Sequence, residues 1–264
     1  MSQWGVHRLS MRGMGRPMAG LALWAVLSAS GAMAQTTGNF TAGPSAPPSL
    51  NQWLDRLQEA SRRRAYIGTF VVSAGSAMSA SKIWHVCDGT QQMERIDSLT
   101  GTARTTLRKN DEVLTLVPES RVAWAEKREA LRPFPDQIKT PGNAIEEHYT
   151  LRLLGVERVA GFEADVLHIQ PRDALRFGYR VWSEKQTGLT VKMQTLDGQG
   201  QVIEQMVFSE LQLDAPVKME SLARQMAKTQ GYKILRPQLN STTAEAQGWR
   251  LKQDVPGFLP MSSH

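Results

Sequence analysis

Four short runs of β-forming residues between Gly161 and Glu210 constrain the fold of this chain more than any other stretch. Turn residues separate the runs, which are Val166–Ile169, Tyr179–Trp182, Leu189–Leu196 and Val202–Phe208. Connections this short join only antiparallel neighbours, because a parallel return needs a crossover of roughly a dozen residues or more. The sequence therefore predicts an antiparallel meander.

Six further strand candidates precede the meander, again separated by turn residues. They are Tyr66–Val72, Lys82–Cys87, Gln91–Ile96, Arg104–Leu107, Val113–Val117 and Arg121–Ala125. Residues 149–154 fit a helix or a strand equally well, and residues 157–160 are strand-like. Because β-sheets twist, an antiparallel sheet of this width curls. Apolar side chains occupy both faces of the last meander strand, so we expect another element or a guest to cover part of the sheet.

An amphipathic helix is predicted just before the first strand. Ser49 and Gln52 have the spacing of a capping box. The apolar residues of one helix face follow at i, i+3, i+4 and i+7 spacing: Leu50, Trp53, Leu54 and Leu57. We expect this apolar stripe to lie on the sheet. The predicted fold class is therefore α+β, a curved antiparallel sheet with a helix across its concave side.

The first 34 residues have the pattern of a secretory signal peptide. Three arginines precede an apolar run at residues 18–29, and residues 32–34 form an A-x-A cleavage signal. A transmembrane anchor is the alternative, but the run is shorter than the roughly 20 residues that span a bilayer. We therefore expect an exported, soluble chain.

The remaining residues divide by composition into four parts. Residues 35–48 are a leader rich in Pro, Gly, Ser and Thr that we expect to be disordered. Residues 49–214 hold the predicted helix and strands. Residues 215–247 combine a short helix at 219–228 with a polar linker. Residues 248–264 are interpreted as the truncated start of a small further domain.

Charge and cysteine content exclude some partners and some sources of stability. The signal peptide carries three arginines and no acidic residue, so its removal lowers the formal charge from +6 to +3. Nucleic acid is not an expected partner of such an exported chain. Cys87 is the single cysteine, so the fold has no intramolecular disulfide and depends on its core. A free thiol in an oxidising compartment survives best when it is buried, so we expect a buried Cys87.

The sequence contains no recognisable enzyme or metal motif. The five histidines lack metal-ligand spacing and have no second cysteine to help them. His85 and His168 fall in predicted strands and are interpreted as hydrogen-bonded sheet residues. Residues 79–82 match S-x-x-K without the K-T-G partner of that catalytic class. We predict a binding protein without catalytic residues, metal or cofactor, and a hydrolase with an unrecognised site is the remote alternative.

A curved sheet with an amphipathic helix across it makes an apolar trough that suits acyl chains or apolar peptide segments. The candidate lining comes from the helix stripe, from the first strands and from methionines, whose thioethers adapt to irregular shapes. These residues are Trp53, Leu57, Phe70, Val72, Trp84, Met193 and Met206. The alternative for each of them is a place in a solid core.

Several blocks of residues carry a family resemblance. The first set comprises Tyr66-x-Gly68-x-Phe70, His85-x-x-Asp88-Gly89, Glu94-Arg95-Ile96, Arg104 and Pro118. The second and more specific set comprises Arg158-Val159-Ala160-Gly161, Pro171-Arg172-Asp173, Arg176-Phe177-Gly178-Tyr179-Arg180 and Trp182. Over about residues 50–213, the chain resembles the RseB/MucB regulators of the envelope-stress sigma factor.

The resemblance implies a periplasmic protein whose domain at 49–214 is similar to the lipoprotein carriers LolA and LolB, which are half-open β-barrels covered by helices. It also implies that the chain binds the periplasmic segment of a membrane-spanning, RseA/MucA-like anti-sigma factor and shields it from proteolysis. Lipopolysaccharide or lipoprotein acyl chains would release that segment through their differential affinity for the unbound state. Residues 248–264 look like the start of the family's smaller carboxy-terminal domain.

The chain departs from the family pattern at Thr105, where the family usually has an acidic residue, so an ion pair is not expected there. A periplasmic lipid or lipoprotein carrier that uses the same trough is the alternative function. Whether the chain forms a homodimer is left open.

Overall fold

The computed structural model describes residues 48–127, 145–237 and 242–250, together with residues 252, 253, 255 and 258. The predicted signal peptide at 1–34, nearly all of the leader at 35–48 and most of residues 248–264 lie outside the described residues. None of the described helices has the length and apolar character that a membrane crossing requires.

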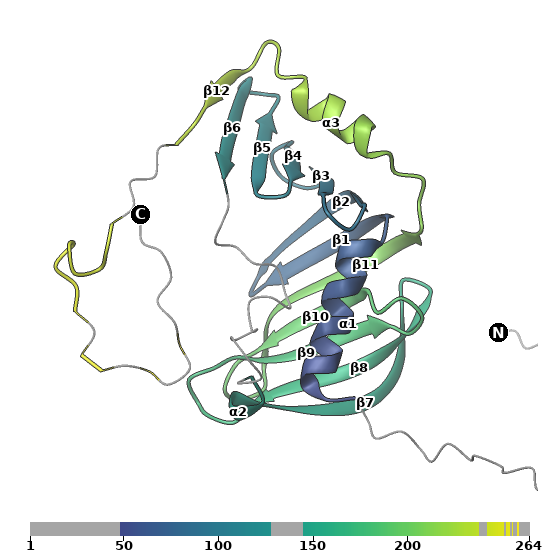
Figure 1. Cartoon of the computed structure of the whole chain (residues 1–264), viewed down its shortest axis with the longest axis vertical. Coiled ribbons are helices and arrows are strands. Elements are labelled where there is room, and N and C mark those ends of the chain that lie inside the picture. The colour runs from purple at the N-terminus through teal and green to yellow at the C-terminus, as the bar shows by residue number, and fades with distance from the viewer. Residues whose placement is uncertain are drawn as a thin grey trace, which may run out of the picture. The chain divides into compact units, whose positions relative to one another are not determined.

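The described strands form one sheet in the order β12-β6-β5-β4-β3-β2-β1-β11-β10-β9-β8-β7 (Figure 1). The strands are β1 Tyr66–Ala74, β2 Ala77–Cys87, β3 Gln92–Ser98, β4 Thr105–Lys109, β5 Glu112–Val117, β6 Val122–Lys127, β7 Tyr149–Val159, β8 Phe162–Pro171, β9 Gly178–Glu184, β10 Thr190–Leu196, β11 Val202–Leu213 and β12 Lys233–Leu235. The helices are α1 Leu50–Arg63, α2 Ile145–His148 and α3 Met219–Ala227. Neighbouring strands pair antiparallel, except β12 and β6, which are parallel. The predicted α+β class is confirmed, and the curved sheet is open because β12 and β7 form separate edges.

The predicted meander is confirmed as β8 to β11, which are sequential neighbours in the sheet. A two-residue turn at Ala160 and Gly161 joins β7 to β8, with φ angles of 49° and 91°. Two positive φ angles give the twist that a two-residue hairpin requires, and glycine adopts such an angle without strain. The Val-Ala-Gly part of the family-like block at residues 158–161 is therefore a hairpin signal.

The six upstream strand candidates are confirmed as β1 to β6, with boundaries that differ by a few residues. Residues 149–154, which fit a helix or a strand, join residues 157–159 of the strand-like run at 157–160 in one strand, β7, and Ala160 lies in the turn that follows. The predicted helix at 219–228 is α3. Residues 233–235, assigned to the polar linker, form β12 instead, and they are ordered as a strand because they pair with Val122, Ala123 and Trp124 of β6.

The two longer helices cover opposite faces of the sheet. The capping box of α1 is confirmed, since the Ser49 hydroxyl accepts from the Gln52 amide at 3.3 Å and Gln52 Oε1 accepts from the Ser49 amide at 2.8 Å. Figure 1 shows α1 lying across the strands β8 to β11, and α3 beside β3 to β5. A second cluster packs on the α3 side: Leu107, Leu114, Ala123, Met226, Tyr232 and Ile234.

Gly68 allows an aromatic ring of β11 to lie against β1. A Cβ at this position would meet Phe208 Cε1 at 2.6 Å and the carbonyl oxygen of Glu210 at 2.9 Å. Phe208 also contacts Phe70 and Tyr66 edge-on, with ring centroids 5.9 Å and 6.1 Å apart. The spacing Tyr66-x-Gly68-x-Phe70 is therefore explained by two aromatic residues that flank the glycine on one face.

The change Leu54→Ala is expected to lower the free energy of unfolding by about 2–5 kcal/mol, because it leaves a cavity where a completely buried side chain packs. Leu99→Ala is the matched control, since Leu99 is 54% exposed, and its effect is expected to stay within about 0.5 kcal/mol. Urea denaturation followed by circular dichroism measures both. Equal effects of the two changes would contradict the central place of α1 in the core.

Candidate functional site

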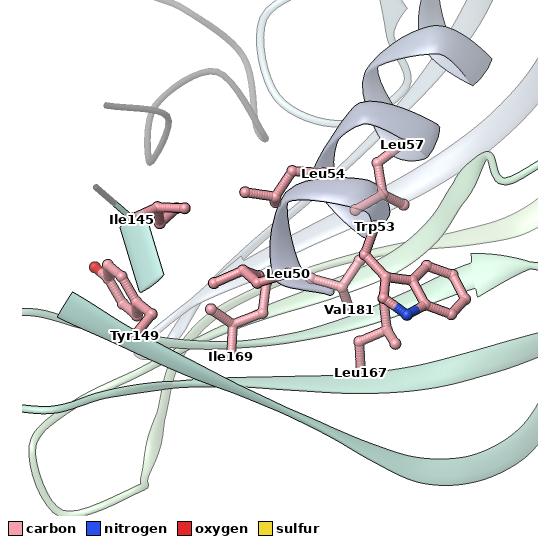
Figure 2. Close-up of a cluster of buried hydrophobic side chains, with 9 residues drawn as sticks. All are labelled: Leu50, Trp53, Leu54, Leu57, Ile145, Tyr149, Leu167, Ile169 and Val181. Atoms are coloured by element: carbon pink, nitrogen blue, oxygen red, sulfur yellow. The ribbon is translucent and has the colours of Figure 1, made fainter. Parts of the chain in front are cut away.

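The apolar stripe of α1 lies on the sheet, as predicted, and its side chains are buried there (Figure 2). Trp53, Leu54 and Leu57 are 7%, 0% and 2% exposed. The rest of this cluster is Leu50, Ile145, Tyr149, Leu167, Ile169 and Val181. The helix's own side chains therefore pack against the sheet directly beneath α1.

A polar contact holds the last turn of α1 to the sheet. His85 is buried, and its Nε2 lies 3.0 Å from the carbonyl oxygen of Ser61. Because a carbonyl oxygen only accepts, the proton of this hydrogen bond belongs to Nε2. The imidazole also stacks on Tyr66, with ring centroids 4.8 Å apart. The interpretation of His85 as a hydrogen-bonded sheet residue is confirmed for this nitrogen.

Glu94 faces the other nitrogen of His85. Glu94 Oε2 lies 3.5 Å from His85 Nδ1, and Arg108 Nη1 lies 3.4 Å from Glu94 Oε1. Burial alone would raise the pKa of the Glu94 carboxyl, but His85 and Arg108 outweigh burial and hold that pKa below its ordinary value. Burial and the charge of Glu94 raise the pKa of Tyr66 far above its ordinary value. This cluster ties the end of α1 to strands β1 to β4.

Four predicted lining residues form an apolar strip on the same face of the sheet as α1. The apolar strip consists of Phe70, Val72, Met193 and Met206. Cross-strand register places Val72 opposite Met206, and Met206 opposite Met193. All four side chains are partly exposed. They differ in this from Trp53 and Leu57, which are buried beneath the helix.

Trp84 lies on the opposite face of the sheet, next to α3. Lys82 Nζ and Arg95 Cζ lie 5.3 Å and 5.2 Å from its ring centroid. Arg95 also donates a hydrogen bond of 2.6 Å to Gln225 of α3. His85, one residue further along β2, faces α1 instead, because successive strand residues point to opposite faces. The structure therefore does not bring Trp84 together with the apolar strip.

Sequence reasoning missed Ile96 and Trp124, which lie on the α1 face further toward β6. Ile96 pairs with Thr106, Thr106 with Thr115, and Thr115 with Trp124. Trp124 is 43% exposed. A strand pattern indicates that Trp124 alternates with the buried Ala123, but it does not tell which of the two faces α1.

Cys87 and the acidic residues do not form a metal site in the described part of the chain. Cys87 is free and half-buried, so it is less buried than expected. Within residues 48–127, 145–237 and 242–250, no group of His, Cys, Asp and Glu side chains has the arrangement of a metal site.

The profile of the MucB/RseB N-terminal domain matches residues 49–226, about two thirds of the chain. The chain belongs to the MucB/RseB family. Family membership agrees with the blocks at residues 158–161 and 171–182, which form the β7–β8 turn and the end of β8 through most of β9.

Curated members of the MucB/RseB family are longer than this chain. The sequence is 32% identical over 167 residues to the sigma factor AlgU regulatory protein MucB of Pseudomonas aeruginosa. This aligned stretch covers 62% of this chain and 51% of the relative. It is 22% identical over 197 residues to the sigma-E factor regulatory protein RseB of Escherichia coli K12. This aligned stretch covers 73% of this chain and 62% of the relative. The chain thus spans about half to three fifths of the length of these relatives.

Solved MucB structures share the fold of this MucB/RseB-family chain. The crystal structure of MucB in complex with MucA(peri) matches 65% of this chain and 58% of that chain, with a TM-score of 0.53 and 30% identity. The structure of the Pseudomonas aeruginosa MucA/MucB complex matches 64% of this chain and 59% of that chain, with a TM-score of 0.52 and 29% identity.

The change Glu94→Gln is expected to lower the free energy of unfolding at neutral pH by about 1–3 kcal/mol, because it removes a buried carboxylate from its partners Arg108 and His85. A lowered carboxyl pKa in the folded state adds stability above the unfolded pKa, and this stability is lost as the pH falls through the folded pKa. The difference between the natural protein and the variant should therefore shrink in acid.

Urea titrations at a series of pH values measure this difference. Glu112→Gln is the control, because Glu112 is exposed. A difference for Glu94→Gln that does not change with pH would contradict the electrostatic account of this cluster.

Proposed function

We propose that this chain is a periplasmic regulatory protein that binds the periplasmic segment of a membrane-spanning anti-sigma factor and shields it from proteolysis. The main support is family membership over residues 49–226, together with the solved complex of the related MucB with MucA(peri). Curated relatives are named as regulatory proteins of sigma factors. The signal peptide predicted at residues 1–34 supports export to the periplasm.

The ligand that regulates this binding is an acyl chain of lipopolysaccharide or of a lipoprotein, bound on the apolar strip. The strip is partly exposed and borders the buried underside of α1, so a guest can begin to bind without unpacking the helix. Its two methionines adapt their shape to a flexible chain. Each CH₂ group removed from water contributes about 0.8 kcal/mol. An acyl chain that binds the free protein more tightly than the complex with the anti-sigma factor weakens that complex. The effect equals the difference between its two binding free energies.

The same apolar strip favours a second candidate function, a periplasmic lipid or lipoprotein carrier. The two functions differ in their partner, because a carrier has no need to bind the anti-sigma factor. Both functions require the strip to accept an acyl chain.

The full chain is expected to bind the fluorescently labelled periplasmic segment of an anti-sigma factor saturably and to slow its cleavage by protease. Fluorescence anisotropy measures the binding, and gel analysis of a protease time course measures the protection. A denatured sample is the control. Failure to bind, together with extraction of acylated protein from membranes, would favour the carrier.

The change Phe70→Glu is expected to weaken binding of a fluorescent fatty acid by about tenfold or more, because a carboxylate on the apolar strip must lose water when the acyl chain binds. Val71→Glu is the matched control, since Val71 lies on the same strand with similar burial but points to the other face. Circular dichroism checks that both variants fold. Equal binding by the two folded variants would show that the strip is not the acyl site.

A further inference from the structure

Basic side chains gather on the face of the sheet opposite α1. Register places Arg152 of β7 beside His168 of β8, and His168 beside Arg180 of β9. Leu167, which precedes His168, and Val181, which follows Arg180, pack beneath α1. Because successive strand residues point to opposite faces, the three basic side chains share the other face. Directly paired residues have Cβ atoms about 5 Å apart, so Arg152, His168 and Arg180 form one basic row.

Carboxylates do not neutralise the basic row in the part of the chain that the structure describes. No acidic residue there forms an ion pair with Arg152 or Arg180. Glu157, the nearest acid on this face of β7, accepts a hydrogen bond of 2.8 Å from Trp182 Nε1. The next cation on this face, Lys192 of β10, lies over the Trp182 ring with Nζ 4.1 Å from the centroid. Arg152 and Arg180 lie on either side of His168, and their two positive charges remain without a carboxylate partner among the described residues.

Arg180 is held in place with one donor unused. Its Nη1 donates to Gln194 Oε1 at 3.3 Å, and Gln194 Nε2 donates to Gln205 Oε1 at 2.6 Å. These amides orient the guanidinium. The Nε of Arg180 is buried and has no hydrogen-bond partner among the described residues. A buried donor without an acceptor is costly, so the burial of this guanidinium is only partly compensated.

The pKa of His168 reflects the positive charges of Arg152 and Arg180. Burial lowers the pKa of His168, and the charges of Arg180 and Arg152 lower it further. An anion bound between the arginines would offset this effect, so protonation of His168 and binding of the anion are coupled.

We propose that the basic row binds a phosphate-type oxyanion, either free phosphate or the phosphomonoester of a lipid headgroup. Guanidinium groups bind such oxyanions through paired, charge-assisted hydrogen bonds, and Arg152 and Arg180 flank His168 in the row. This site lies on the face opposite the apolar strip. It therefore does not depend on the function proposed above.

The test is an NMR titration of His168 in the full chain with inorganic phosphate, compared with sodium chloride at equal ionic strength. Chloride screens the arginine charges and raises the pKa of His168 somewhat, so it measures the non-specific effect. Phosphate is expected to raise this pKa further and saturably. The variant His168→Gln identifies the resonance. A response to phosphate no larger than the response to chloride would overturn the proposal.

Arg180→Gln and Arg152→Gln are expected to weaken phosphate binding by about tenfold or more, because each removes a charge-assisted hydrogen bond. Arg104→Gln is the matched control, since Arg104 is exposed and lies outside the row. Circular dichroism checks that all three variants fold. Equal weakening by the control would mean that net charge, and not the row, attracts phosphate.

Vesicles distinguish the two sources of the phosphate group. Co-sedimentation with phosphatidylcholine vesicles that contain phosphatidate, lost in Arg180→Gln, supports a lipid headgroup. A soluble anion is supported if Arg180→Gln loses phosphate binding and the natural protein does not bind the vesicles. It is also supported if Arg180→Gln loses phosphate binding but still binds the vesicles. The proposal is overturned if the protein binds neither phosphate nor the vesicles. It is also overturned if the protein binds both and Arg180→Gln changes neither binding.

Discussion

The burial of the apolar stripe of α1 on the sheet is the interaction on which the rest of the structure depends. Leu54 and Leu57 have almost no exposed surface, and each such side chain contributes about 1.5–3 kcal/mol when it leaves water. The helix also joins distant parts of the sheet, because its first turns pack on β8 and β9 and its last turns on β1 and β2. The same burial occupies the surface directly beneath the helix, so the acyl site proposed above is the neighbouring apolar strip.

The two ends of α1 are held by different kinds of force. The first half rests on apolar contacts, which are non-directional and insensitive to charge. The last turn is held by the hydrogen bond from His85 to Ser61 and, behind it, by Glu94 and Arg108. Because hydrogen bonds and ion pairs depend on geometry and protonation, this end of the helix fixes the position of α1 on the sheet more specifically than its apolar half does.

The alternation of strand residues gives the sheet two chemically different faces. Leu167, Val181 and Met193 face α1, and the residues next to them are His168, Arg180 and Gln194 on the other side. Strands β8 and β9 thus carry an apolar surface on one face and two members of the basic row, His168 and Arg180, on the other. Two ligands on these faces would not compete for space, because the apolar strip lies on β1, β11 and β10 and the basic row lies on β7, β8 and β9.

The sequence by itself determined the local elements: the capped helix at Ser49 and the meander after Gly161. Caps, turns and period-two patterns are properties of neighbouring residues, so they are readable in one dimension. Tertiary structure decided which face each strand turns toward α1, which separated Trp84 from Phe70 and added Ile96 and Trp124. It also made a strand of residues 233–235. These outcomes depend on register between strands far apart in sequence, where a shift of one residue moves every side chain to the other face.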